Sequence, residues 1–107
     1  MATNDKNTIE VSKRLDSINV GEFKADAMSF LEKSAEGIVI DFSNTVFIDS
    51  AGLGALVSIL KTATQKSKRL ALACLSPQVA QIFELTKLYR IFDIYDTVDR
   101  AQINFKS

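Results

Sequence analysis

Hydrophobic and polar positions along this chain switch between two periods, one typical of strands and one typical of helices. Residues 8–12 alternate apolar and polar side chains, which predicts a half-exposed strand at a sheet edge. Residues 38–42 and 69–75 are nearly continuous apolar runs, as expected for strands buried on both faces of a parallel sheet. Residues 45–48 and 91–95 are shorter apolar segments, and the second of them predicts a last short strand.

Other segments carry helical spacing or helix-start signals. Apolar side chains recur every three to four positions in residues 22–34 and again from residue 50 to about residue 66. Ser76 and Pro77 predict a helix start, because serine is a good N-cap and proline suits the first helical position. Residues 96–99 predict a terminal helix, in which Asp96 and Asp99 form an acidic variant of the capping box. The predicted stripes are Phe23, Ala27, Phe30 and Leu31, then Leu53, Leu56, Val57 and Leu60, then Val79, Ile82, Phe83 and Thr86.

This alternation of strands and helices predicts an α/β domain with a mostly parallel or mixed central sheet. We expect roughly four to five strands with about four helices around them. Leu15 is predicted to continue the sheet begun by residues 8–12, ahead of a turn-rich loop at residues 16–21. Residues 1–7 are predicted to form a flexible tail, so that the domain itself spans residues 8–107.

Composition narrows the functions that such a domain can have. The 107 residues include 13 acidic and 13 basic side chains, so net charge gives no reason to expect nucleic acid or an anionic membrane as a partner. The chain has no histidine and one cysteine, which excludes histidine-based nucleophiles, histidine general bases and the usual zinc sites. We therefore expect a protein with no enzyme activity, no metal and no cofactor.

Two features bear on the cellular compartment. The N-terminal residues are polar and lack the apolar core of a secretory signal, and no apolar run in the sequence approaches the ~20 residues that span a bilayer. Cys74 lies inside an apolar run and is predicted to be a buried thiol, which suits a reducing compartment. Together these features predict a cytoplasmic protein.

The most informative stretch is residues 40–54, where a buried strand, a turn and a short apolar segment lead into a helix. The hydroxyl of Ser50 suits a helix N-cap, and on the local pattern alone this structural role is the simpler interpretation. Gly52 and Gly54 cost roughly 1–2 kcal/mol of helix propensity relative to alanine. Either close packing of helix on sheet or close approach of another protein has to explain them.

Residues 41–43 (Asp-Phe-Ser) and 49–54 (Asp-Ser-Ala-Gly-Leu-Gly) resemble the signature of STAS domains, and specifically of bacterial anti-sigma factor antagonists. The resemblance covers nearly the whole chain and implies a single STAS-type domain. Further matches to the family are Arg14, Leu15 and Asp16 in the first loop, residues 69–72 in a later strand, and residues 76–79 and 83–88 in the helix after it.

The same resemblance implies a partner-switching cycle in transcription regulation. In the family, the serine equivalent to Ser50 is phosphorylated by an anti-sigma factor that is itself a serine kinase. The unphosphorylated antagonist binds that kinase and frees the sigma factor, and a PP2C-type phosphatase restores the binding form. We accordingly expect phosphorylation at Ser50. The expected partner-binding residues are Asp16, Ser17, Asn19, Asp49, Ser50, Ala51, Gly52, Leu53, Gly54 and Val57.

Some of these residues also have plain structural interpretations. Leu53 and Val57 fit the apolar stripe of the second helix, and Asp16 fits a turn. Phosphorylation of Ser50 adds about −1.5 to −2 charges at a helix start, where anions are tolerated, so it should alter the surface without unfolding the domain.

The alternative function is a STAS accessory subunit of a transport or stress-signalling complex, in which the same surface docks constitutively.

Overall fold

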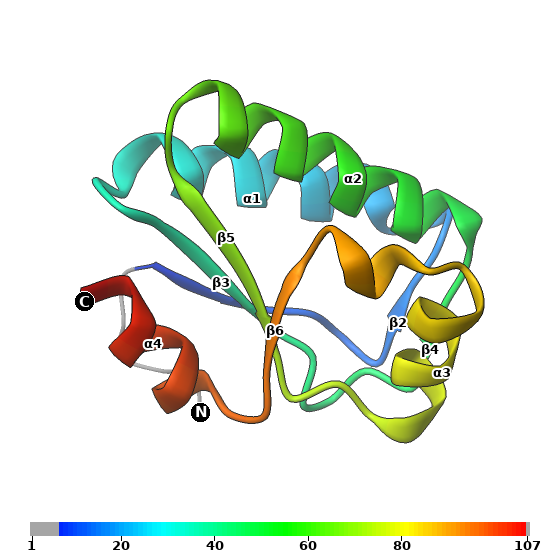
Figure 1. The fold of residues 1–107 in the computed structure, drawn as a ribbon. Helices are drawn as coiled ribbons and strands as arrows, with labels where there is room; N and C mark the ends of the chain where they lie inside the picture. Colours follow the sequence, from blue (N-terminus) through cyan, green and yellow to red (C-terminus); the bar gives the residue numbers. More distant parts are fainter. Residues whose placement is uncertain (1–6, 107) are drawn as a thin grey trace.

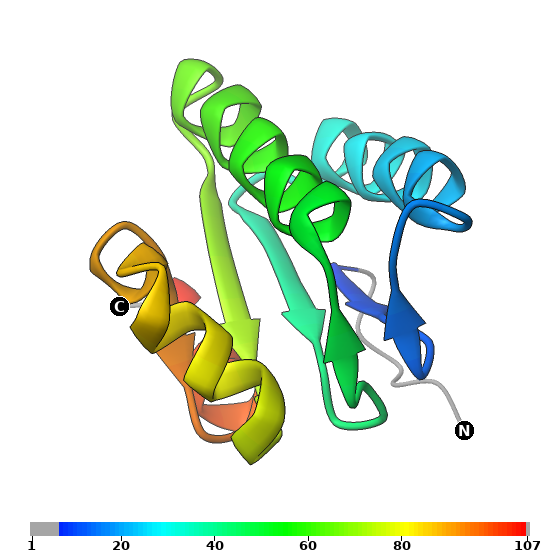
Figure 2. The same cartoon turned by 90° about the vertical axis from the view of Figure 1, so that its right-hand side faces the viewer.

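The computed structural model describes residues 7–106 and has the alternation of strands and helices that the hydrophobic pattern predicts. Its elements are β1 (Thr8–Glu10), β2 (Arg14–Leu15), α1 (Val20–Lys33), β3 (Gly37–Asp41), β4 (Phe47–Ile48), α2 (Ser50–Gln65), β5 (Arg69–Ala73), α3 (Pro77–Leu85), the 3₁₀ turn η1 (Leu88–Arg90), β6 (Asp93–Tyr95) and α4 (Val98–Lys106). In Figure 1, α1 and α2 run side by side along one face of the sheet, and α4 lies on the other side. Figure 2 shows the same pairing of α1 with α2 from a perpendicular direction.

Strand pairings among residues 7–106 are all parallel. The main sheet has the order β1-β3-β5-β6, so the predicted edge position of the first strand is confirmed. The prediction that Leu15 continues this sheet is wrong, because Leu15 pairs with Ile48 in a separate two-stranded sheet of β2 and β4. The chain leaves the main sheet after Val11, and the buried Thr45 hydroxyl donates to the Ser12 carbonyl at 2.8 Å.

The core has two parts, one on each face of the main sheet. All five residues of β3 are buried, which confirms the prediction of a central buried strand. Ile38 and Ile40 join the larger cluster beneath α1 and α2, whereas Val39 packs with Ala101 and Phe105 of α4. This division follows from the pleat, because successive side chains of a strand point to opposite faces. Each fully buried apolar side chain of this size contributes about 1.5–3 kcal/mol.

Helix starts agree with the sequence prediction in one place and differ in another. Ser76 caps α3, since its Oγ accepts a hydrogen bond from the Val79 N–H at 3.3 Å. The capping box predicted for Asp96 and Asp99 is wrong. Thr97 caps α4 by accepting a hydrogen bond from the Arg100 N–H at 3.1 Å, because β6 runs to Tyr95 and the helix begins only at Val98.

The buried face of α2 is rotated relative to the predicted stripe. Leu56 is buried as expected, but Leu53, Val57 and Leu60 are half-buried and pack against the core from the flanks. The inner face of α2 carries small residues, namely Gly52, Ala55 and Ala63, which allow the helix to pack closely against the strands. This close packing is favoured over the burial of larger side chains such as Leu53. The buried residues of α2 are Gly52, Ala55, Leu56, Ile59 and Ala63.

Two predictions concern the ends of the chain and its relation to membranes. The predicted flexible tail falls on residues 1–6, outside the described residues, and on Asn7. The carbonyl of Asn7 accepts a hydrogen bond from the Val39 N–H at 2.8 Å, and its side chain accepts one from Gln102 at 2.9 Å. Of the helices that the structure describes, none combines the length and the apolar character needed to cross a bilayer.

Candidate functional site

The start of α2 is capped by Asp49, not by Ser50. Asp49 has an extended backbone, and its Oδ1 accepts a hydrogen bond from the Gly52 N–H at 3.0 Å. This carboxylate therefore satisfies one of the free N–H groups of the first turn and places negative charge at the positive end of the helix dipole. The structural interpretation of Ser50 as the N-cap is thus wrong, because the neighbouring residue occupies that position.

Ser50 is the first residue of α2 and is exposed to solvent. Within residues 7–106, the structure gives its hydroxyl no hydrogen-bond partner. A hydroxyl at this position is accessible to an enzyme, and it contributes nothing visible to the packing or capping of the helix. The serine therefore has a reactive group on the surface that the fold itself does not use.

The first loop, residues 16–19, is held in one conformation by its own side chains. Asp16 is buried, and its Oδ1 accepts a hydrogen bond from the Ile18 N–H at 3.0 Å. Asn19 Oδ1 accepts from the Asp16 N–H at 3.0 Å, and its Nδ2 donates to the Arg14 carbonyl at 2.7 Å. Asx side chains commonly form such local bonds to nearby backbone, which gives Asp16 and Asn19 clear structural roles.

Asp16 is also paired with a cation. Its Oδ2 accepts a hydrogen bond from Arg14 Nε at 3.1 Å, and the Arg14 guanidinium lies 4.5 Å from the centre of the Phe47 ring. The hydrogen bond from Arg14 is the main reason that the pKa of Asp16 lies below its ordinary value, with the Ile18 and Asn19 backbone bonds acting in the same direction against the effect of burial. The carboxylate is therefore charged at neutral pH.

Hydrogen bonds connect the start of the first loop and the end of β2 to Asp49, at the start of α2. The Ser17 N–H donates to Asp49 Oδ2 at 3.2 Å, while the other oxygen of the same carboxylate caps the helix. The Asp49 N–H in turn donates to the Leu15 carbonyl at 3.2 Å. The structure thus brings together two groups of predicted residues that lie about thirty positions apart in sequence.

The two glycines of α2 have different surroundings. A Cβ at Gly52 would lie 2.6 Å from the Leu15 carbonyl oxygen and 2.8 Å from Ile48 Cγ1, so packing against β2 and β4 explains this glycine. Gly52 is buried and therefore has little surface to offer a partner. A Cβ at Gly54 would meet nothing within 4 Å, and Gly54 is exposed. Packing within the domain therefore does not explain Gly54.

The remaining predicted residues fall around this point. Ser17 is exposed, and Ala51 and Leu53 are half-buried in the first turn of α2. Val57 lies one turn further along and is also half-buried, so Leu53 and Val57 both contribute to the core while leaving part of their surface exposed.

Ile18 lies within the first loop and was not among the predicted site residues. The residue is 92% exposed, although the backbone on both sides of it is fixed by hydrogen bonds. Single exposed apolar side chains are common on protein surfaces, so Ile18 points to an interaction site only together with other exposed apolar residues. Val46 and Phe47, which precede Asp49 closely in the sequence, are also partly exposed. The signal available in the sequence was an isoleucine within a run of turn-forming residues, whose small polar side chains cannot bury it.

We call the surface formed by Ser17, Ile18, Asp49, Ser50 and Gly54 the Ser50 face.

Other reactive groups are sparse in the part of the chain that the structure describes. It contains no group of three or more His, Cys, Asp or Glu side chains placed to hold a metal ion. Cys74 is half-buried rather than fully buried, because it follows β5 with a left-handed backbone (φ 64°) instead of lying within the strand. Burial, together with the nearby Asp41 carboxylate, raises the pKa of the Cys74 thiol, which lowers its reactivity.

Comparisons with known proteins agree on one family. Residues 1–101 match the STAS domain family. Over 80 residues the chain is 30% identical to the anti-sigma-B factor antagonist of Staphylococcus aureus, a match that covers 75% of this chain and 74% of the relative. It is 33% identical over 64 residues to the anti-sigma F factor antagonist of Paenibacillus polymyxa, covering 60% of this chain and only 55% of that relative.

A solved structure supports the same conclusion about the fold. The structure of an anti-sigma-factor antagonist (STAS) domain protein from Planctomyces limnophilus superimposes with a TM-score of 0.86 at 19% identity. That match covers 98% of this chain and 96% of the other. At this level of identity the similarity establishes the architecture alone.

Proposed function

Because this chain belongs to the STAS domain family, we propose that it acts as an anti-sigma factor antagonist controlled by phosphorylation of Ser50. In its unphosphorylated form it binds a serine-kinase anti-sigma factor in the cytoplasm and frees the sigma factor. The observation that carries the proposal is the exposed Ser50 hydroxyl, which has no part in capping because Asp49 performs that role. The chain acts as a binding protein in this cycle, and the kinase supplies the chemistry.

The position of Ser50 suits a modification that must be reversible and harmless to the fold. A phosphate at the first position of a helix lies near free N–H groups and the positive end of the dipole, so the native state tolerates it. The added charge of about −1.5 to −2 lies next to the Asp49 carboxylate, whose two oxygens already accept hydrogen bonds. A partner docked on the Ser50 face then meets bulk and unpaired negative charge. A PP2C-type phosphatase acting on the exposed phosphoserine restores binding.

Ile18 is the residue on this face best suited to anchor the kinase. A buried apolar side chain contributes about 1.5–3 kcal/mol, and the ordered first loop reduces the entropy lost when it docks. Gly54 leaves the adjacent helical surface without a side chain, so the partner can approach the backbone. Leu53 and Val57 extend the apolar area along α2.

The proposal is tested by incubating the protein with a candidate kinase and ATP, mapping the modified residue, and titrating both forms against the kinase. Wild type and the control Ser29→Ala, which changes an exposed serine of α1 outside the Ser50 face, should each accept one phosphate, and Ser50→Ala should accept none. The phosphoprotein should bind at least tenfold more weakly than the unmodified form, a loss of about 1.4 kcal/mol or more. Equal binding of the two forms would contradict the switch and favour a constitutive docking subunit.

The docking surface is tested separately with Ile18→Ser. We expect the loss of this side chain to weaken kinase binding about tenfold or more while leaving stability unchanged, since Ile18 is 92% exposed. Ile103→Ser is the matched control, because Ile103 is also an exposed isoleucine (66%) but lies on α4, on the other side of the sheet. Similar effects of the two substitutions would show that Ile18 is not at the interface.

A further inference from the structure

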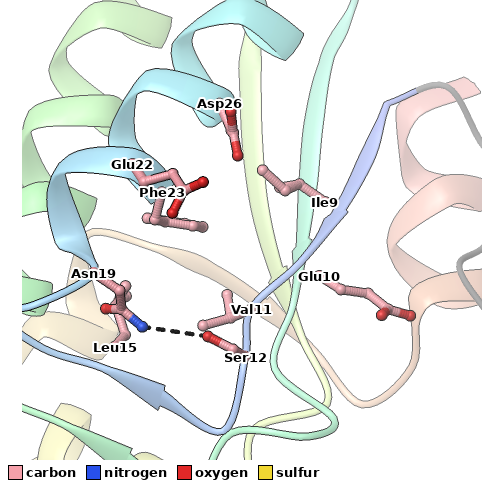
Figure 3. A pocket seen from close by; sticks show the side chains of 9 residues that line it. All are labelled: Ile9, Glu10, Val11, Ser12, Leu15, Asn19, Glu22, Phe23 and Asp26. Atoms are coloured by element: carbon pink, nitrogen blue, oxygen red, sulfur yellow. Dashed lines mark hydrogen bonds between the residues drawn. The ribbon is translucent and has the colours of Figure 1, made fainter.

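A cavity of about 160 Å³ lies between the edge strand β1 and helix α1. Its lining includes four apolar side chains and the polar side chains of Ser12 and Asn19. Figure 3 shows the Asn19–Ser12 hydrogen bond (3.3 Å) closing one end of the cavity. The apolar lining residues are Ile9, Val11, Leu15 and Phe23.

The apolar floor of this cavity is part of the fixed core. Leu15 is fully buried, and Val11 and Phe23 are 3% and 8% exposed, so none of them can move far without disturbing the packing beneath α1. The cavity is therefore preformed. It is smaller than the roughly 300–1,000 Å³ of sites for drug-sized ligands, which suits one short aliphatic chain rather than a nucleotide.

The mouth of the cavity is acidic. Glu22 and Asp26 extend from α1 over the opening, whereas Glu10 of β1 points away from it (Figure 3). Glu22 and Asp26 are four residues apart on one helix, so they are neighbours on the same face and repel each other. In residues 7–106 neither carboxylate has an ion-pair partner. A cation placed between them relieves this repulsion.

We propose that this cavity binds a small organic cation, an aliphatic ammonium whose alkyl chain contacts Val11 and Phe23 and whose charged nitrogen lies between Glu22 and Asp26. The two halves of such a ligand match the two halves of the site, an apolar floor and an anionic rim. This proposal does not rest on the phosphorylation switch, although Asn19, which lines the cavity, is also one of the expected partner-binding residues.

The test is a titration of the full chain with n-pentylammonium chloride, in which binding is measured from the changes in the amide chemical shifts of the protein. Two probes of equal chain length serve as comparisons, neutral 1-pentanol and anionic pentanoate. We expect saturable shifts centred on Val11, Glu22 and Phe23, tightest for the ammonium, weaker for the alcohol and weakest for the carboxylate. No saturable response to the ammonium, or an equal response to all three probes, overturns the proposal.

The role of the carboxylates is tested with Glu22→Gln/Asp26→Asn. Both side chains are exposed, so the variant should fold normally, and its affinity for pentylammonium should fall about tenfold while its affinity for pentanol stays the same. Glu36→Gln/Glu84→Gln is the matched control, since it removes the same charge from exposed positions outside the cavity. A similar loss in both variants would mean that only net charge matters, and the assignment of a specific site would be wrong.

Discussion

Asp49 and Ser50, although adjacent, contribute very differently to the fold. Asp49 caps α2 through Gly52 and holds Ser17, whereas the Ser50 hydroxyl has no such contact within the described residues. We predict that Asp49→Ala lowers the free energy of unfolding by about 1 kcal/mol, the usual cost of losing an N-cap. Ser50→Ala should change it by less than about 0.5 kcal/mol. Urea denaturation of the two variants measures the difference.

Ser76→Ala provides the calibration for this experiment. Ser76 is a serine that does cap a helix, through the Val79 N–H, so its loss should cost about as much as the loss of Asp49. If Ser50→Ala proved as destabilising as Ser76→Ala, the hydroxyl would have a structural role that its position does not reveal, and the interpretation of Ser50 as a group kept for modification would weaken.

Gly52 and Gly54 form a second pair of near neighbours with opposite expectations. Gly52→Ala should destabilise the protein by about 1–3 kcal/mol, because the new Cβ would lie 2.6 Å from the Leu15 carbonyl and the backbone would have to shift. Gly54→Ala should stabilise it by up to about 1 kcal/mol, since its Cβ meets open space and alanine is the better helix former. Thermal unfolding of both variants checks the two signs.

The functional counterpart of this pair is binding. If the kinase approaches the backbone at Gly54, then Gly54→Ala should bind more weakly in spite of its greater stability. Gly54→Ala binding as tightly as wild type would remove Gly54 from the proposed interface, and its glycine would then be without a physical explanation.

At the scale of elements, the first loop depends on the charge state of one buried carboxylate. Arg14 and backbone N–H groups hold the pKa of Asp16 below its ordinary value of 3.8. The folded state therefore binds this proton less tightly than the unfolded chain does. The resulting stabilisation is complete above about pH 3.8 and is lost as the pH falls through the lowered pKa of the folded state.

Replacing Arg14 tests this explanation of the lowered pKa of Asp16. Arg14→Gln should raise the pKa of Asp16 toward its ordinary value, because the largest cause of the shift is removed. The pH titration of the Asp16 carboxyl carbon by NMR measures the change directly. Arg100→Gln removes a positive charge from α4 and should leave the Asp16 titration as it is. An unchanged titration in Arg14→Gln would mean that the backbone bonds of Ile18 and Asn19 alone determine this pKa.

The elements that the sequence predicted well are those with long, regular patterns. The segment at residues 38–42 is apolar except for Asp41, and β3 is buried throughout. By contrast, β2 and β4 contain two residues each, too few to show any period, so the separate small sheet was not predictable. The buried face of α2 was mispredicted because the pattern weighs large apolar side chains, whereas the fold favours close approach through Gly52 and Ala55.

At the scale of the whole molecule, some features of the site could be predicted from the sequence and others could not. The motif around Ser50 identified the serine and the acid beside it, and it led to the family. Which of the two caps the helix depends on backbone geometry at a single residue, and both types are preferred caps. The bond from Ser17 to Asp49 joins residues far apart in sequence, and the exposure of Ile18 depends on that bond and on the packing of β2. Such long-range contacts leave no local pattern.

Phosphorylation of Ser50 should leave the whole molecule folded while weakening its binding to the kinase, and a series of substitutions at this position tests both expectations. In the series Ser50→Ala, wild type, Ser50→Asp and phosphoserine, residue 50 is uncharged in the first two proteins and carries increasing negative charge in the last two. An anion there is stabilised by roughly 0.3–1 kcal/mol, so stability should stay level or rise slightly toward phosphoserine. The Asp49 carboxylate next to it opposes this gain, which keeps the total change small.

Affinity for the kinase should change in the opposite direction along the same series, because the partner meets the added charge and bulk on the Ser50 face. Ser50→Ala should bind about as well as wild type, Ser50→Asp partially, and phosphoserine at least tenfold more weakly, about 1.4 kcal/mol or more. Thermal unfolding and calorimetric titration of all four proteins give both quantities. A parallel loss of stability and affinity would show that the modification acts by unfolding the start of α2. The two quantities changing in opposite directions is the result expected of a surface switch on an intact fold.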